Sequence, residues 1–146
     1  MSDDLEAIRQ LKARYCRFLD TKDYDAWRAL FAPDVVVKLD LAVSAGGADP
    51  QTMPALQGME AFEPVVMAGV RDAATMHHCH TPEIELISDD TATGIWAMED
   101  LLIFADGKEL HGAGHYHETY EKRDGAWVIT TLHLTRTILR MLGGPA

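Results

Sequence analysis

The sequence predicts an α+β domain in which helices come first and an antiparallel sheet follows. Residues 4–20 repeat apolar side chains at steps of three and four, the spacing of an amphipathic helix. From residue 75 the apolar period changes to two, which indicates strands. The turns "ADGK" and "RDGA" contain Asp-Gly, the pair preferred in two-residue hairpins. Helices that precede such a meander are expected to pack on one face of the sheet.

Three helices and one strand are expected before the meander. The apolar positions of the first helix are Leu5, Ile8, Leu11, Tyr15 and Phe18 or Leu19. A second short helix, "YDAWRALF", ends ahead of Pro33 because proline disfavours helical geometry in the residue before it, and "DVVVKLDLA" is expected to be a strand. Residues 44–55 are rich in Gly and Pro and predict a loop. "GMEAFEPVVMAGV" predicts a third helix, kinked or interrupted at Pro64.

Composition favours one domain that does not bind nucleic acid. The 146 residues, 47% of them hydrophobic, fit a single globular domain over residues 1–146. The net charge of −10 disfavours nucleic acids and anionic membranes as partners, because phosphate binding needs a local excess of Lys and Arg. No apolar run approaches the ~20 residues of a membrane span, and the first residues lack the pattern of a signal peptide. A cytoplasmic protein is therefore expected.

Residues 75–86, "TMHHCHTPEIEL", carry three histidines and a cysteine just ahead of a predicted strand. The two cysteines of the chain, Cys16 and Cys79, lie on different predicted elements and form no Cys-x-x-Cys pair. Neither a disulfide framework nor a cysteine zinc site is expected, and both thiols are expected to be reduced and partly buried.

The faces of the sheet follow from turn lengths, because residues directly opposite in an antiparallel pair point to the same side. Two-residue loops at 89–90, 106–107 and 124–125, with no bulge, are assumed. The line of opposed residues is then Cys79, Asp100, Ala113 and Arg136. The face of Asp100 is expected to hold His77, diagonal to Asp100, with Trp96, Met98, Leu102, Phe104, His111, His115, His117, Leu132 and Leu134.

The opposite face is expected to offer a second pair of histidine and carboxylate, His80 and Glu99. Its other members are expected to be His78, Ile84, Leu86, Ile95, Tyr116, Tyr120, Trp127, Ile129 and His133. Parity alone does not choose between the two faces, and a bulge at Pro82 would shift the first strand.

The face of Asp100 is the better candidate for a chemical site because three ionisable groups, His77, Asp100 and Arg136, converge on an otherwise apolar surface. Such groups are costly to bury unless they pair or serve a ligand. A histidine beside a carboxylate is oriented by it and suited to proton transfer, although a structural pair is the alternative. The first helix adds Tyr15 on its apolar face and Asp20 at its end. Core packing of Tyr15 and capping by Asp20 are the alternatives there.

Four segments of the chain resemble the SnoaL-like, nuclear transport factor 2-like superfamily: "YCRFLD", "MHHCHTPEIEL", "TATGIWAMEDLL" and "YEKRDGAWVI". The resemblance covers nearly the whole chain and is closest to the bile-acid 7α-dehydratases, with scytalone dehydratase more distant. It implies a cone-shaped, curved antiparallel sheet wrapped around the N-terminal helices, and it implies no metal or other cofactor. The pocket residues of these dehydratases match Tyr15, Asp20, His77 and Asp100, and an arginine on the last strand matches Arg136.

The expected activity is that of a cofactor-independent dehydratase acting on a cyclic hydroxy-carbonyl compound such as a steroid or polyketide. His77, held by Asp100, would move the proton, Tyr15 would donate a hydrogen bond to the carbonyl oxygen, and Asp20 would position Tyr15 or bind substrate. The side chains expected to bind the substrate are Arg136, Trp96, Met98, Leu102, Phe104, His115, His117 and Leu132.

Three other functions stay open. A proton shift like that of ketosteroid isomerase needs the same groups but loses no water. A protein that only binds a small hydrophobic cyclic ligand, or that serves only as an oligomer scaffold, predicts no hydrogen bond between His77 and Asp100. A metal site would use His77, His115 and His117, because His-x-His on a strand presents two imidazoles to one side.

A homo-oligomer, either dimer or trimer, is also expected. The reason is the apolar side chains assigned to the second face of the sheet, which are Ile84, Leu86, Ile95, Tyr120, Trp127 and Ile129.

Overall fold

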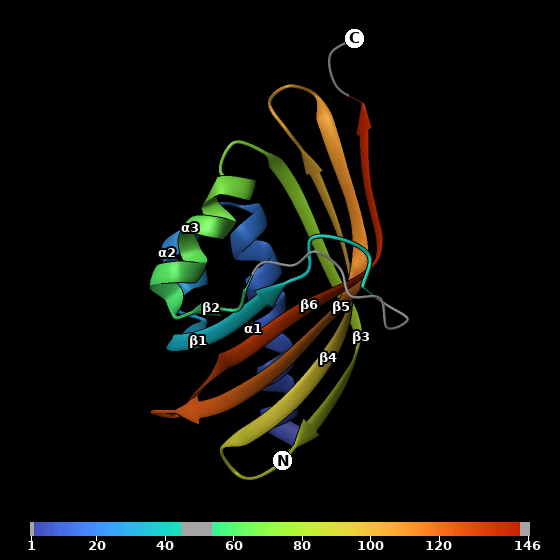
Figure 1. Ribbon diagram of the computed structural model, residues 1–146. Helices are drawn as coiled ribbons and strands as arrows, with labels where there is room; N and C mark the ends of the chain where they lie inside the picture. Colours follow the sequence, from blue (N-terminus) through green and yellow to red (C-terminus); the bar gives the residue numbers. More distant parts are fainter. Residues whose placement is uncertain (1, 45–53, 144–146) are drawn as a thin grey trace.

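The computed structural model describes residues 2–44 and 54–143, and it shows helices packed in the hollow of a curved sheet (Figure 1). The helices are α1 (Ser2–Asp20), α2 (Tyr24–Arg28) and α3 (Met59–Val70). The strands are β1 (Phe31–Leu39), β2 (Leu56–Gln57), β3 (Ala74–Leu86), β4 (Thr91–Ile103), β5 (Lys108–Arg123) and β6 (Ala126–Gly143). Most of the loop expected at residues 44–55 lies outside the described residues.

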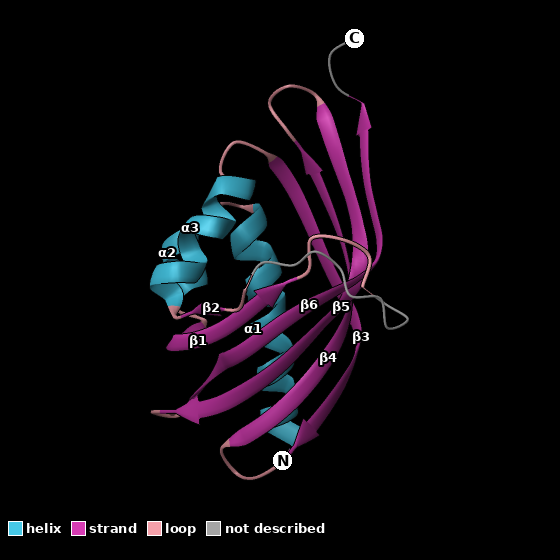
Figure 2. Cartoon of the chain, in the orientation of Figure 1, coloured by secondary structure: helices cyan, strands magenta, loops and turns pink. Residues whose placement is uncertain are grey.

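The α+β prediction is confirmed: all the described helices lie on one side of the sheet, as Figure 2 shows. The sheet order is β2-β1-β6-β5-β4-β3, and the two end strands do not pair with each other, so the sheet is curved but unclosed. None of the described helices is long and apolar enough to cross a membrane.

Helix α1 packs along the concave face because its apolar positions form one stripe. Ile8, Leu11, Tyr15 and Leu19 are all buried in the core. Its first turn is acidic and its last turn carries Arg17, which suits the helix dipole at both ends. The helix ends at Asp20, and this end places one carboxylate beside β3.

Helix α3 and strand β1 depart from the simplest sequence prediction. Pro64 lies inside α3, yet α3 continues from Met59 to Val70 without interruption. Strand β1 pairs in parallel with β6, the last strand of the chain, although the meander itself is antiparallel. Sequence periodicity carries no information on such a long-range neighbour.

Turn lengths decide which side chains face the helices, and two of the three assumed turns are one residue longer. Ile87 donates its backbone N–H to the carbonyl of Thr91, and Phe104 donates to that of Lys108, so each pair brackets a three-residue loop. Only the loop at Asp124 and Gly125 has two residues, both with positive φ.

Two β-bulges add to these shifts at the site residues, and a third register shift lies between Ala113 and Gly114. One lies between His80 and Glu83, where Thr81 has φ 44°, so the bulge considered at Pro82 is present. The other adds Thr130 to β6, because Thr119 pairs with Thr131 while Tyr120 pairs with Ile129. In β3 the longer turn and the bulge cancel, so His77 still faces inward, directly opposite Asp100 rather than diagonal to it.

The assignment of β5 is wrong as a result. Its inward side chains are the even-numbered ones, including Tyr116, Glu118 and Tyr120, whereas His115 and His117 face outward. Near the turns, the residues that face the helices are the ones that the sequence analysis had assigned to the outer face. Residues expected on the outer face but packed on or within the core are Ile84, Leu86, Tyr116, Tyr120, Trp127 and Ile129. Of the apolar side chains on which oligomerisation was argued, only Ile95 stays outside that core, so the oligomer stays a prediction without this support.

Candidate active site

The end of α1 and the start of β3 form a partly buried pair between Asp20 and His77. Oδ1 of Asp20 lies 2.7 Å from Nδ1 of His77, and Oδ2 accepts the backbone N–H of His77 at 2.8 Å. The hydroxyl of Thr75 donates to Oδ1 at 2.9 Å. Only 6% of the His77 side chain and 15% of the Asp20 side chain are exposed. Three contacts therefore fix the carboxylate, and two of them come from one histidine.

These contacts keep Asp20 ionised and set the tautomer of His77. Burial by itself would raise the pKa of Asp20, but the hydrogen bonds and charge of His77, with the Thr75 hydrogen bond, outweigh it and lower the pKa. An ionised carboxylate can only accept, so Nδ1 of His77 carries the proton. In a neutral imidazole Nε2 then has the free lone pair, and this atom has no hydrogen-bond partner among residues 2–44 and 54–143.

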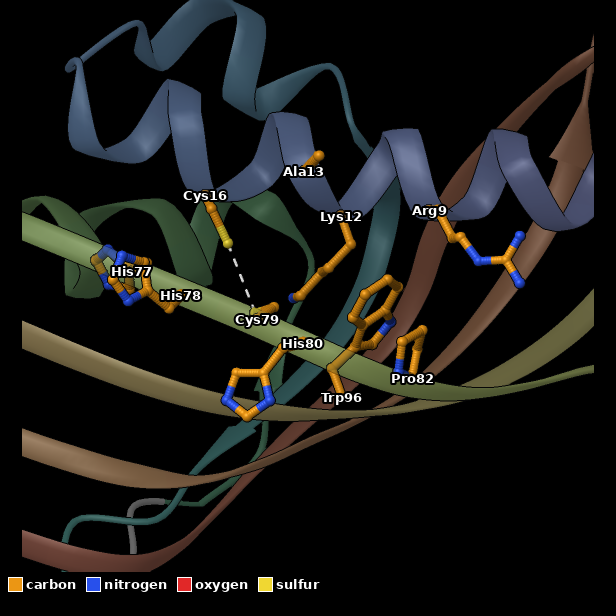
Figure 3. A pocket seen from close by; sticks show the side chains of 10 residues that line it. All are labelled: Arg9, Lys12, Ala13, Cys16, His77, His78, Cys79, His80, Pro82 and Trp96. Carbon is orange, nitrogen blue, oxygen red and sulfur yellow. Dashed lines mark hydrogen bonds between the residues drawn. The ribbon is translucent and has the colours of Figure 1, made fainter.

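A cavity of about 450 Å³ lies between α1 and β3, and His77 is part of its wall (Figure 3). The walls also include Lys12 and Cys16 from the helix, Cys79 from β3, and Trp96 from β4. Its volume falls within the range of small-molecule sites, roughly 300–1,000 Å³. His77 and the carboxylate bound to it therefore lie at the edge of a space large enough for a molecule of modest size.

Asp100 does not hold His77, contrary to the sequence prediction. Both of its oxygens accept from Arg136, Nη1 to Oδ1 at 3.1 Å and Nη2 to Oδ2 at 3.2 Å. Both side chains are buried. The pair occupies the space beside Gly112, where a Cβ atom would lie 2.1 Å from both Nη1 of Arg136 and Oδ1 of Asp100. The missing hydrogen bond between His77 and Asp100 is what the ligand-binding alternative predicts, but Asp20 supplies the carboxylate instead.

Tyr15 lies in the core rather than in the cavity wall. Its hydroxyl contacts that of Tyr116 at 3.3 Å, and its ring packs edge-on against Phe31. Burial raises the pKa of Tyr15 well above its usual range. The predicted hydrogen bond from Tyr15 to a substrate carbonyl therefore has no support from this position.

The residues predicted to bind substrate divide into four groups. Trp96 lines the cavity. Four apolar side chains pack in or against the core: Met98, Leu102, Phe104 and Leu132. Arg136 is bound to Asp100 in a salt bridge. His115 and His117 lie on the outer face, where their rings are 6.3 Å apart.

The proposed metal site of His77, His115 and His117 is therefore wrong, because the first faces inward and the other two face outward. Across the residues that the structure describes, no group of three or more His, Cys, Asp or Glu side chains could hold a metal ion.

Sequence reasoning missed a fully buried ion pair, Lys12 with Glu118, whose Nζ and Oε2 are 2.7 Å apart. Nζ of Lys12 also lies 3.6 Å from the ring centre of Tyr15 and 3.7 Å from that of Tyr116. The hydroxyl of Tyr120 donates to Glu118 at 2.7 Å and accepts from the indole of Trp96 at 2.9 Å. The available signal was that Lys12 falls four residues after Ile8, inside the apolar stripe of the helix.

The family model of the SnoaL-like domain matches residues 1–133. The protein belongs to the SnoaL-like family. The probable cyclase FGR4 from Gibberella zeae is 26% identical to this SnoaL-like chain over an alignment of 145 residues that covers 92% of this chain and 92% of that protein. The closer resemblance to bile-acid 7α-dehydratases stays a prediction.

Solved structures confirm the nuclear transport factor 2-like fold of this SnoaL-like protein. A candidate scytalone dehydratase from Novosphingobium aromaticivorans superposes with a TM-score of 0.82 at 20% identity, covering 100% of this chain and 95% of that one. A hexachlorocyclohexane dehydrochlorinase of LinA type 3 from Novosphingobium barchaimii gives 0.77 at 19%, covering 98% and 92%. A protein of unknown function from Mycobacterium tuberculosis, Rv3472, gives 0.73 at 26%, covering 91% and 71%.

Proposed function

We propose that this SnoaL-like protein is a cofactor-independent lyase that removes water from a cyclic hydroxy-carbonyl compound bound beside His77. The single observation that carries the proposal is the Asp20–His77 pair, 2.7 Å apart, on the wall of the cavity. Nε2 of His77 takes the proton from the carbon next to the carbonyl, and Asp20 stabilises the imidazolium that forms. The same imidazolium then returns a proton to the departing hydroxyl.

Relatives of the chain support an elimination of this kind. Structural neighbours include a dehydrochlorinase and a candidate dehydratase, and the relative in Gibberella zeae is named as a probable cyclase. Loss of water and loss of HCl from neighbouring carbon atoms both require a base that removes a proton from carbon. Likeness at these levels of identity supports the fold and the class of site, and the substrate is inferred from the cavity.

The cavity favours a compact, mostly apolar ring. Trp96 and the stem of Arg9 offer apolar surface, and about 450 Å³ leaves room for a small ring system. Lys12 also contributes to the same wall, although its ammonium is buried in the ion pair with Glu118. A proton shift without loss of water would use the same atoms and is distinguished by its product.

The test is turnover of a panel of cyclic hydroxy-ketones by the wild type and by His77→Ala. We expect elimination products from at least one compound, and a loss of about 10²- to 10⁴-fold in His77→Ala, the usual contribution of a general base. His111→Ala is the matched control, because His111 lies on the outer face beside Glu109. Circular dichroism and the unfolding midpoint show that both variants are folded. Equal turnover by wild type and His77→Ala would reject His77 as the base.

A second candidate function is ligand binding without chemistry, favoured by the bond between Asp100 and Arg136, which leaves Asp100 no role in proton transfer. It predicts that panel compounds raise the unfolding temperature of the wild type and of His77→Ala by similar amounts, with no product formed. Product formation that depends on His77 would exclude this alternative.

A further inference from the structure

The cavity wall brings together the two cysteines of the chain. Sγ of Cys16 on α1 lies 3.5 Å from Sγ of Cys79 on β3, although 63 residues separate them in sequence. Figure 3 shows the two side chains directed toward each other across the gap between helix and strand, with Lys12 beside them. Both thiols are partly buried and both line the open cavity, so a small reagent can reach them.

We infer that Cys16 and Cys79 form a dithiol that is a site of reversible oxidative modification, which small disulfide compounds convert into a disulfide between α1 and β3. An S–S bond is about 2.05 Å long, so the sulfurs need to approach by about 1.5 Å. The contact between the thiols already selects the correct pair without any rearrangement of the fold. Dithiols that form transient disulfides in reducing compartments are typically catalytic or redox-sensing.

The surroundings give the two sulfurs different roles. A hydrogen bond with Cys79 lowers the pKa of Cys16, and the charge of Lys12 lowers it further, against the opposing effect of burial. The same hydrogen bond and burial raise the pKa of Cys79. The thiolate is the nucleophilic form, so Cys16 attacks first and Cys79 completes the exchange.

The exchange balances with one small disulfide as the oxidant. The Cys16 thiolate attacks one sulfur of that disulfide, forms a mixed disulfide and releases one small thiolate. Cys79 gives its proton to the released thiolate and attacks the sulfur of Cys16, which expels the second small thiolate. Two protein thiols are oxidised, and one small disulfide is reduced to two thiols.

Closure also changes the cavity in which the proposed reaction takes place. The new bond ties α1 to β3 two residues away from His77 and converts the Cys16 thiol beside Lys12 into part of a disulfide. This expectation rests on the proposed function: turnover should fall in the oxidised protein and return after treatment with dithiothreitol.

The test incubates the folded full-length chain with oxidised glutathione, blocks remaining thiols with a maleimide and measures the intact mass. We expect the main product to be lighter than the dithiol by two hydrogen atoms, to carry no maleimide, and to return to the dithiol on reduction. The unfolded chain in guanidinium, where the two cysteines are not held together, is the reference for intrinsic reactivity.

Two variants separate the roles of the sulfurs. Cys79→Ser should stop at a stable adduct with one glutathione on Cys16, and Cys16→Ser should react more slowly than Cys79→Ser. The inference is overturned if the folded wild type accumulates glutathione adducts without internal closure, or does not react when the unfolded chain does. Closure of the disulfide in a protein that turns over no compound would reject the proposed lyase and leave the dithiol site standing.

Discussion

Asp20 and Asp100 both lie next to His77, one at the end of α1 and the other directly opposite on β4, yet they bind different partners. Asp20 binds the imidazole of His77 through Nδ1, and Nε2 of that ring has no hydrogen-bond partner among the described residues. Asp100 uses both oxygens on the guanidinium of Arg136, a group with N–H donors only and no atom that can accept a proton from a substrate. The contrast teaches that the partner of a carboxylate, and not its proximity to His77, decides whether it can support proton transfer.

The largest expected effect is on turnover by Asp20→Asn. The amide no longer fixes the tautomer of His77 or stabilises its protonated form, so kcat/KM should fall by about 10²- to 10⁴-fold. Asp40→Asn is the matched control, because Asp40 also accepts from a histidine, His133, at 3.0 Å but away from the cavity. A similar loss of kcat/KM in both variants would contradict a specific role for the contact between Asp20 and His77 in turnover.

The next largest effect is a loss of stability in the variant Asp100→Ala. It leaves the buried Arg136 without its carboxylate, which should cost about 3–5 kcal/mol in the free energy of unfolding, measured in urea. The double variant Asp100→Ala with Arg136→Met removes both charges and should recover much of that loss. A loss below about 1 kcal/mol would mean that the pair contributes no more to stability than an exposed salt bridge, and would contradict a stabilising role for Asp100.

Gly112→Ala should disturb the same pair by a smaller amount. The added methyl group would lie 2.1 Å from atoms of both Asp100 and Arg136, so the salt bridge has to open or shift. Overpacking of this kind costs about 1–3 kcal/mol in the free energy of unfolding. Gly69→Ala is the control, since a Cβ there meets no atom within 4 Å in helix α3 and should stabilise by about 0.5–1 kcal/mol. Equal effects of the two substitutions would contradict the close fit around Gly112.

The smallest effect is a change in acid sensitivity. The pKa of Asp20 is lower in the folded protein than its usual value, so its ionised form stabilises the fold. That contribution is complete above the unfolded pKa of about 3.9 and is lost as the pH falls through the lower folded pKa. The difference in unfolding free energy between wild type and Asp20→Asn should therefore shrink on acidification below about pH 4. A difference that stays constant with pH would argue against an ionised Asp20.

Local sequence signals predicted the parts of the fold that depend on neighbouring residues. The apolar stripe of α1 was read from steps of three and four, and the Asp124–Gly125 turn from its need for positive φ at both positions. The placement of His77, Asp100 and Arg136 on one face was also predicted, whereas the salt bridge between Asp100 and Arg136 was not. The motif resemblance added the family, which the match over residues 1–133 confirms.

The remaining parts depend on single-residue shifts that periodicity does not encode. The "ADGK" turn contains the preferred Asp-Gly pair, but Gly107 takes positive φ at the end of a three-residue loop, which turns His115 and His117 outward. The extra Thr130 then restores the expected face for Leu132 and Arg136. The choice of Asp20 over Asp100 as the partner of His77 depends on where α1 ends against β3, a tertiary contact.

The burial of Lys12 against Glu118 constrains the order in which the chain folds. The two residues are 106 positions apart in the sequence. Strand β1 pairs in parallel with β6, the last strand of the chain, so this pairing forms only after β6 has been added to the sheet. Until β5 and β6 exist, the ammonium on α1 stays hydrated and the helix cannot dock fully without losing that hydration. Contacts so distant in sequence slow folding, so the first helix of the chain should be among the last elements to lock in place.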